Sequence, residues 1–237
     1  MHCAIIAAGE GSRLAQEGIL RPKPLVELDG RPMIVRLIDI MASAGADSIT
    51  VAVRDTMPDV IQVLESVQGT LPCPLRILPC NTPSSMHSFH VVSQAVEPGP
   101  LVLTTVDTIF RADDFRAYAA AFTDGKVDAL MGVTDFIDDE KPLYVDVDAY
   151  GRITAFRDSA SAADRYISGG IYGLSQSARD ILNDCIAAGT QRMRNYQRAL
   201  LSAGLNVKAF PFSKIIDVDH AADIDTARSF INDSQAL

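Results

Sequence analysis

Short apolar runs alternate with helical patterns over the first 135 residues, and this alternation restricts the fold more than any other feature of the chain. The apolar runs, which read as buried strands, lie at residues 3–7, 49–53, 75–78, 101–105 and 127–133. The segments between them have helical spacing, at residues 32–44, 57–67, 84–96 and 113–122. Strand–helix alternation implies a mostly parallel sheet with helices on both faces. We therefore predict an α/β fold of three layers, α/β/α, with ligands bound at the carboxyl ends of the strands.

The pattern changes from residue 140 onward. Two strand-like segments, 144–147 and 152–156, are separated by four residues that read as a hairpin turn. Further strands are expected at 165–174, 207–210 and 215–216, with helices between them and a closing helix in which Ile224, Ala227 and Ile231 share a face. No long linker or repeat interrupts the chain. We predict a single domain over residues 1–237, with an inserted β region in its second half.

Charge and cysteine content restrict the partners. The formal net charge of −9 disfavours nucleic acid and anionic membranes, so an anionic ligand would need a local cluster of positive charge or a metal. The cysteines, Cys3, Cys73, Cys80 and Cys185, form no Cys-x-x-Cys pair, and we expect free thiols in a reducing compartment. No apolar stretch approaches the ~20 residues that span a bilayer, and the first residues enter a strand at once. We expect a cytoplasmic protein with a small-molecule partner; whether it forms a homo-oligomer is left open.

A glycine-rich segment, Ala7-Ala8-Gly9-Glu10-Gly11-Ser12-Arg13-Leu14, follows the first strand. Glycines there let backbone amides approach phosphate oxygens without interference from Cβ atoms. Arg13 and Lys23 add the positive charge that a triphosphate needs, and Pro22 and Pro24 restrict the direction of the lysine. The spacing fits neither a P-loop nor Gly-x-Gly-x-x-Gly. The alternative is a plain strand-to-helix turn followed by a solvated basic segment.

With these motifs the chain resembles the sugar nucleotidyltransferases and their relatives, which have a Rossmann-like catalytic domain. The resemblance continues through residues 26–33, Asp107, Gly151-Arg152-Ile153, residues 168–172 and Asp217-Val218-Asp219. It implies a nucleotide-binding half at residues 1–135 and an acceptor-binding half, with the closing helix, at 136–237. It also implies that Ala7, Ala8, Gly9, Gly11, Ser12 and Arg13 bind the nucleotide, and that Arg13 and Lys23 are catalytic, with Lys23 contacting the phosphates that undergo transfer.

Acidic residues follow two separate strands. Asp107 comes after the buried run 101–105, and Asp217 and Asp219 point to the same side of an extended segment. Mg²⁺ prefers carboxylates together with phosphate and water oxygens, so we predict a magnesium site formed by Asp107 with Asp217 or Asp219. The resemblance implies the same pairing. The alternatives are a turn residue or helix cap at Asp107 and an N-cap at Asp219. The acidic run 135–140 is interpreted as a solvated loop.

Residues 81–88 correspond to a segment that contacts the base in the family. Ser84 and Ser85 either serve there, as nucleotide-binding residues, or cap the helix that follows; the two interpretations are evenly balanced. His87 and His90 lie three residues apart on that helix, but they have no third ligand at matching spacing, which disfavours a metal.

The acceptor site departs from the family pattern. Members often carry Glu-Lys-Pro after the strand that follows Gly-Arg-Ile, and residues 155–159 have no lysine. Arg157 or Arg165 could take over binding of the acceptor phosphate, and the Gly169–Gly170 pair is also assigned to acceptor binding. A sugar 1-phosphate is favoured. Phosphocholine, an inositol or glycerol phosphate, or a molybdopterin-type acceptor stays open.

The sequence therefore predicts an Mg²⁺-dependent nucleotidyltransferase, whose partners are a nucleoside triphosphate and a small phosphorylated acceptor and which releases pyrophosphate. A cytidylyltransferase acting on a non-sugar phosphate is the first alternative. A non-catalytic nucleotide-binding protein and a GT-A-type glycosyltransferase, with Asp217-Val218-Asp219 as its metal motif, are the others. A dinucleotide dehydrogenase is disfavoured, because the third glycine and the later acidic residue are missing.

Overall fold

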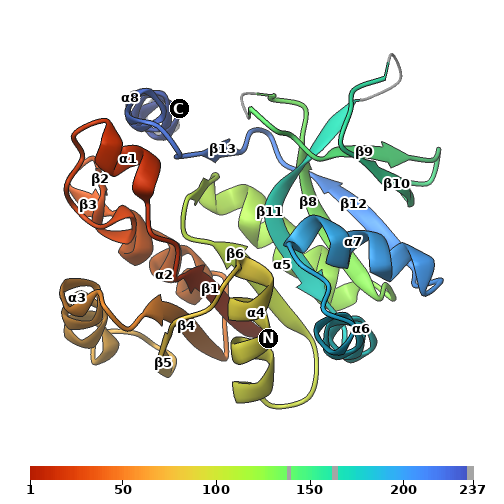
Figure 1. Ribbon diagram of the computed structural model, residues 1–237, viewed down its shortest axis with the longest axis horizontal. Helices are drawn as coiled ribbons and strands as arrows, with labels where there is room; N and C mark the ends of the chain where they lie inside the picture. Colours follow the sequence, from red (N-terminus) through yellow and green to blue (C-terminus); the bar gives the residue numbers. More distant parts are fainter. Residues whose placement is uncertain (138–139, 162–164, 234–237) are drawn as a thin grey trace.

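A nine-stranded sheet forms the centre of the molecule in a computed structural model, which describes residues 1–137, 140–161 and 165–233 (Figure 1). Its main path has the order β10-β9-β11-β6-β1-β4-β5, and β8 pairs with β11 and β12. The strands are β1 (His2–Ala7), β4 (Ser48–Arg54), β5 (Leu75–Cys80), β6 (Leu101–Thr105), β8 (Ala129–Thr134), β9 (Tyr144–Val147), β10 (Ile153–Arg157), β11 (Tyr166–Leu174) and β12 (Val207–Pro211).

Most of the long strands run in one direction, as predicted. Strand β1 is parallel to β4 and β6, β4 is parallel to β5, and β8 is parallel to β12. Strand β11 runs antiparallel between β6 and β8, so the two predicted halves share one sheet. The predicted hairpin is confirmed: β9 and β10 pair antiparallel, and the Asp148 carboxylate accepts hydrogen bonds from the backbone N–H groups of Tyr150 and Arg152. The division into two functional halves stays a prediction.

Helices cover both faces of the sheet because side chains alternate along the strands. On one face, Cys3 and Ile5 of β1 pack with α2 (Met33–Ser43), α3 (Pro58–Gln68) and α5 (Ala112–Asp124). On the other, Ala4 and Ile6 pack with α4 (Ser85–Ala95), α6 (Gln176–Ala187) and α7 (Met193–Ser202). The three-layer α/β/α prediction is confirmed. Pro32, expected in the first turn of α2, is its N-cap instead, and Gly45 follows the helix with φ of 83°.

A third apolar cluster joins the two ends of the chain. It packs α8 (Ala221–Asn232) against α1 (Ser12–Gln16), the short ladder of β2 (Glu27–Leu28) and β3 (Arg31–Pro32), and the ladder of β7 (Thr108–Ile109) and β13 (Ile216–Asp217). Ile224 and Ala227 are buried in α8 as expected, but the third buried position is Phe230 and Ile231 is only half-buried. This cluster places the closing helix beside the glycine-rich loop (Figure 1).

Two further sequence predictions can be compared with the structure. Cys3, Cys73 and Cys185 are buried, Cys80 is half-buried and all four are free thiols, as expected. Within the described residues, no helix is both long and apolar enough to cross a bilayer. The acidic run 135–140 includes residues 138 and 139, which lie outside the described residues.

Candidate active site

The glycine-rich loop leaves β1 and turns directly into α1. Gly11 is the N-cap of α1 and has φ of 65° and ψ of 29°, a left-handed conformation that favours glycine. A Cβ atom at Gly11 would lie 2.9 Å from the Cβ atom of Lys23. Gly11 is therefore needed for the turn and for the close approach of the segment that carries Lys23.

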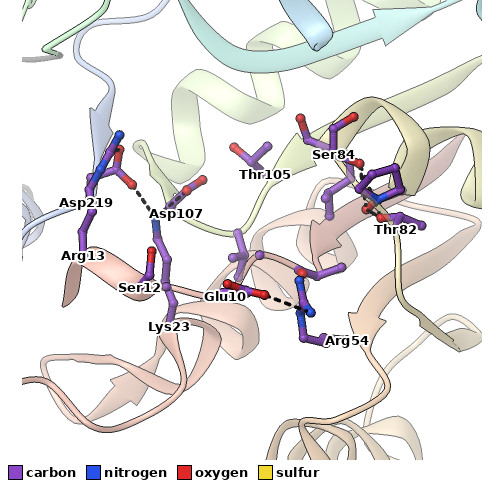
Figure 2. Close-up of a pocket in the computed structure, with 18 residues that line it drawn as sticks. Glu10, Ser12, Arg13, Lys23, Arg54, Thr82, Ser84, Thr105, Asp107 and Asp219 are labelled. Carbon is purple, nitrogen blue, oxygen red and sulfur yellow. Dashed lines mark hydrogen bonds and ion pairs between the residues drawn. The ribbon is translucent and has the colours of Figure 1, made fainter. Parts of the chain in front are cut away.

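Lys23 begins a single 3-10 turn, η1 (Lys23–Leu25), between the two prolines. The turn is closed by hydrogen bonds from Leu25 N to Pro22 O and from Val26 N to Lys23 O. The lysine side chain is only 10% exposed, yet it ends among carboxylates. Its Nζ atom lies 2.6 Å from Oδ2 of Asp107 and 2.6 Å from Oδ1 of Asp219 (Figure 2). The backbone around Lys23 thus aims a buried ammonium group at both acids.

The two acids come from distant parts of the chain. Asp107 follows β6, and Asp219 follows β13. The antiparallel pairing of β7 with β13, extended by a hydrogen bond from Val218 N to Asp107 O, holds the two segments together. Arg13 closes the arrangement, because its Nη1 atom lies 2.6 Å from Oδ2 of Asp219. Two cations and two carboxylates therefore alternate at the carboxyl end of β6.

Each group in this network stabilises the charge of its neighbour. Burial lowers the pKa of the Lys23 ammonium, but the adjoining Asp107 and Asp219 carboxylates outweigh that effect and raise this pKa above its ordinary value. Burial likewise raises the pKa of the Asp107 carboxyl, and the Lys23 ammonium outweighs it, so that this pKa is held below its ordinary value. The lysine and Asp107 are both ionised at neutral pH.

A cleft of about 440 Å³ opens beside these charges. The predicted nucleotide-binding, catalytic and metal residues that line it are Ala8, Gly9, Gly11, Ser12, Arg13, Lys23, Ser84, Ser85, Asp107 and Asp219. Ala7 does not line the cleft, since its side chain is buried at the end of β1. Figure 2 shows Arg13, Lys23 and Asp219 on one side of the cleft and Thr82 and Ser84 on the other. The structure thus brings together the loop, Lys23, Asp107 and Asp219, whereas Asp217 does not line this cleft.

Several residues in the cleft were not predicted. Arg54 is the last residue of β4, and its Nε atom donates to the carbonyl oxygen of Ala8 at 3.1 Å. Its Nη1 atom also lies 3.3 Å from the Glu10 carboxylate, so Arg54 contacts the glycine-rich loop at two residues. A charged residue at the carboxyl end of a parallel strand is the signal that could have found it. Thr82 and Thr105 line the cleft as well.

The serines at the start of α4 face the cleft. Ser84 occupies the N-cap position, but its hydroxyl makes no capping hydrogen bond and lies instead 2.8 Å from Nδ1 of His87. Ser84 is therefore at the N-cap position, as one of the two interpretations expected, but its side chain does not cap the helix. Among the described residues, no three His, Cys, Asp or Glu side chains converge into a metal-binding group, so His87 and His90 do not form one.

A second cavity of about 360 Å³ adjoins the cleft, and Ser85, Thr105 and Asp107 line both. We refer to it as the acceptor cavity, after the role that is proposed for it below. Its other lining residues are Lys141, Leu143, Ser168, Gly170, Tyr172, Arg192, Met193, Arg194, Gln197 and Asp217. Asp217 lines this cavity and Asp219 lines the first cleft, and both also line a smaller pocket together with Arg13.

Most of the residues predicted to bind the acceptor do not line the acceptor cavity. Arg157 lies on β10 outside the lining of both cavities, with its Nη2 atom 2.7 Å from Asp146 and 2.8 Å from Ser161. Arg165 also lies outside the lining and stacks on Tyr166. Arg192 and Arg194, at the start of α7, are the arginines that line the acceptor cavity. No spacing rule points to them, since they flank the beginning of an ordinary amphipathic helix.

The two glycines of β11 have a packing role. A Cβ atom at Gly169 would lie 2.2 Å from Cδ1 of Ile215, and one at Gly170 would lie 2.8 Å from Oγ1 of Thr108. Gly170 also has φ of 72°. Both glycines therefore let β11 pass close to the segments that carry Asp107 and Asp217, and only Gly170 also lines the acceptor cavity.

The fold is that of an α/β nucleotidyltransferase, and the cleft with Arg13 and Lys23 opens at the carboxyl ends of the strands, where such folds bind ligands. Residues 3–170 match the family model of the MobA-like NTP transferase domain. The chain belongs to that family.

Sequence relatives match only part of their own length. A mannose-1-phosphate guanyltransferase of Aspergillus oryzae is 41% identical over 61 residues, which are 26% of this chain and 16% of that protein. A mannose-1-phosphate guanyltransferase of Saccharomyces cerevisiae is 36% identical over 68 residues, covering 29% of this chain and 19% of that one. The chain thus matches under a fifth of the length of these two relatives.

Solved structures share the whole fold. The inositol-1-phosphate CTP transferase from T. maritima has a TM-score of 0.81 at 18% identity, covering 98% of this chain and 96% of the other. A Bacillus anthracis protein assigned as a glucose-1-phosphate thymidylyltransferase has a TM-score of 0.86 at 20% identity, with the same coverage of 98% and 96%. At these identities the likeness concerns the fold alone.

Proposed function

We propose that this protein transfers a nucleoside monophosphate from a nucleoside triphosphate to a sugar 1-phosphate and releases pyrophosphate. The observation that carries the proposal is the meeting of two cavities at Asp107, beside the Lys23 ammonium. One cavity has the glycine-rich loop and its cations, and the other has its own basic residues. Two anionic substrates could be held end to end there.

The nucleoside triphosphate is assigned to the larger cleft. Its phosphates would lie along the loop from Gly9 to Arg13, where glycine backbone and a guanidinium group are available. Its base would lie toward Ser84 and Ser85, on the opposite side. This arrangement leaves the α-phosphate near Lys23, at the junction of the two cavities.

The transfer requires no nucleophile from the protein. An oxygen of the acceptor phosphate attacks the α-phosphorus, and a new P–O bond forms while the bond to the bridging oxygen of the leaving pyrophosphate breaks. Pyrophosphate departs with that electron pair, so negative charge grows on it. Arg13 and Lys23 would stabilise this charge, and the two cavities would hold together anions that otherwise repel one another.

A magnesium ion fits the residues at the junction. The Asp107 and Asp219 carboxylates already share one cation, the Lys23 ammonium, at 2.6 Å each. With two carboxylates and no third converging ligand among the described residues, phosphate and water oxygens would complete the coordination, as is usual for Mg²⁺. Bound there, Mg²⁺ would offset the charge of the reacting phosphates.

The character of the acceptor cavity favours a sugar 1-phosphate over phosphocholine. A quaternary ammonium group needs an aromatic cage or acidic neighbours. Among the described residues, Tyr172 is the single aromatic residue in the lining, and it is buried, while Lys141, Arg192 and Arg194 would repel a cation. The hydroxyl of Ser168 and the amide of Gln197, which lie 3.0 Å apart, offer polar partners for sugar hydroxyls. The names of the sequence relatives point to the same substrate class.

The decisive experiment is an assay for pyrophosphate. Each common nucleoside triphosphate would be incubated with a panel of sugar 1-phosphates, phosphocholine and polyol phosphates, with Mg²⁺ and with a chelator. We expect pyrophosphate release that needs both a sugar 1-phosphate and Mg²⁺. Nucleotide binding without pyrophosphate release from any pair would reject the proposal in favour of a nucleotide-binding protein. Hydrolysis or transfer of a nucleotide sugar would reject it in favour of a glycosyltransferase.

A further inference from the structure

At the end that the acceptor cavity does not share with the nucleotide cleft, the described lining residues include three basic side chains and one acidic side chain, Asp217. Lys141, Arg192 and Arg194 line this end, and none of them lines the cleft. A neutral sugar ring is recognised by hydrogen bonds to its hydroxyls and needs no cluster of positive charge. The charges of these three residues differ in how far the protein itself balances them.

The positive charge of Arg194 is largely balanced by neighbouring groups. Its Nη1 atom lies 2.5 Å from Oδ1 of Asp158, and its Nη2 atom donates to the carbonyl oxygen of Lys141 at 3.0 Å. The same aspartate lies 2.8 Å from Nη2 of Arg198. Arg194 therefore ties α7 to the loop before β9 and shapes the cavity wall.

Arg192 has no such partner among the described residues. Its side chain is exposed, and its guanidinium group makes no hydrogen bond or ion pair with any of the described residues. Its backbone has φ of 70° and ψ of 140°, a region that is essentially limited to glycine. A residue held in that conformation costs stability, and such residues concentrate at ligand-binding sites. Arg192 thus lines the acceptor cavity with a positive charge that has no partner among the described residues.

We infer that the acceptor is a sugar 1-phosphate with a second anionic group at the end of its ring opposite the phosphate, and that Arg192 binds this group. The inference rests on the proposed function. The transferable phosphate belongs at the junction with the cleft, near Asp107, because it must meet the triphosphate there. The far end of the sugar then faces α7. A guanidinium group is suited to a carboxylate or a second phosphate, since it donates two parallel hydrogen bonds to either.

The first test compares acceptors that share one ring. Glucose 1-phosphate is neutral at its far end, glucuronate 1-phosphate carries a carboxylate there, glucose 1,6-bisphosphate carries a phosphate, and glucosamine 1-phosphate carries an ammonium group. We expect at least one of the two acidic acceptors to have a KM about tenfold below that of glucose 1-phosphate. Which of them is preferred distinguishes a carboxylate from a phosphate. If the KM for glucose 1-phosphate equals the KM for each acidic acceptor, the inference is overturned while the proposed function stands. If no acceptor yields pyrophosphate, both fail.

The second test changes Arg192 itself. Arg192→Gln should raise the KM for the acidic acceptor about tenfold, and its effect on the KM for glucose 1-phosphate should be smaller. Arg192→Lys should give a KM for the acidic acceptor between those of the wild type and Arg192→Gln, because lysine keeps the charge but cannot donate two parallel hydrogen bonds. Arg116→Gln, at an exposed arginine of α5 outside both cavities, is the matched control.

A third variant separates binding from structure. Arg192→Gly removes the side chain and suits the positive φ, so it should lose the preference for the acidic acceptor without lowering the unfolding temperature. If these variants lose activity equally on neutral and acidic acceptors, or if Arg192→Gly has a lowered unfolding temperature, Arg192 has only a structural role.

Discussion

Lys23 and Asp219 are 196 positions apart in the sequence, and the Nζ atom of the first lies 2.6 Å from the Oδ1 atom of the second. The contact depends on the apolar cluster that packs α8 against α1 and the β7–β13 ladder. The last helix therefore helps to build the site although it contributes no predicted substrate contact. Lys23 also bridges to Asp107 at 2.6 Å, so one ammonium group holds together acids from two strands.

Replacing Lys23 should affect turnover more than substrate affinity. In the proposed reaction the charge that Lys23 stabilises grows as pyrophosphate departs, so its contribution is larger in the transition state than in the ground state. We expect Lys23→Ala to lower kcat by about 10²–10³-fold, the range seen when one such preorganised donor is removed, and to raise the KM for the triphosphate much less. Steady-state measurement of pyrophosphate release tests this. The control is Lys126→Ala, which removes an exposed lysine outside both cavities. Unchanged turnover in Lys23→Ala would exclude the role.

The same lysine should weaken metal binding in the free protein. Its ammonium group lies between the two carboxylates proposed for Mg²⁺, and a metal without nucleotide would have to displace it. We expect Lys23→Met to bind Mn²⁺ about tenfold more tightly than the wild type in the absence of nucleotide, since a neutral side chain leaves both carboxylates unpaired. Free Mn²⁺ can be measured by its paramagnetic resonance signal. Lys126→Met is the control, and an unchanged or weaker affinity in Lys23→Met would show that the lysine does not compete with the metal.

Asp107 should be required for the metal-dependent reaction. It lies where the two cavities meet, and burial makes its charge dependent on a cationic partner. Asp107→Asn keeps the size of the side chain and removes the charge, so we expect loss of the Mg²⁺-dependent release of pyrophosphate by about 10²-fold or more. The comparison is with Asp113→Asn, an exposed aspartate of α5. Full activity in Asp107→Asn would remove this residue from the proposed metal site.

The sequence predicts the frame of this site better than its contacts. Periodicity placed Asp107 and Asp219 at strand ends, and the glycines and prolines located the loop and Lys23. It could not show that Asp219 pairs with Lys23 while Asp217 lines the acceptor cavity, because these contacts join segments that are far apart in the sequence. The chain breaks its own local pattern at Arg192, where an arginine occupies a conformation typical of glycine. Neither composition nor residue spacing predicts a positive φ at this position.

Gly11 offers the sharpest test of how the loop positions Lys23, because the chain contains a matched control. Gly11 and Gly18 have φ of 65° and 88°, so alanine at either position is strained and should cost about 1–2 kcal/mol of stability. They differ in their surroundings: a Cβ atom at Gly11 would lie 2.9 Å from Cβ of Lys23, whereas one at Gly18 has nothing within 4 Å.

Gly11→Ala should therefore push the Lys23 segment away from Asp107 and Asp219, and a displacement of that kind can cost about 10²-fold in turnover. Gly18→Ala should lose a similar amount of stability in urea-induced unfolding and keep turnover within about twofold. Parallel losses of activity in the two variants would mean that backbone strain alone explains the requirement for Gly11. A selective loss in Gly11→Ala would show that the close packing of the loop on Lys23 sets the position of the ammonium group.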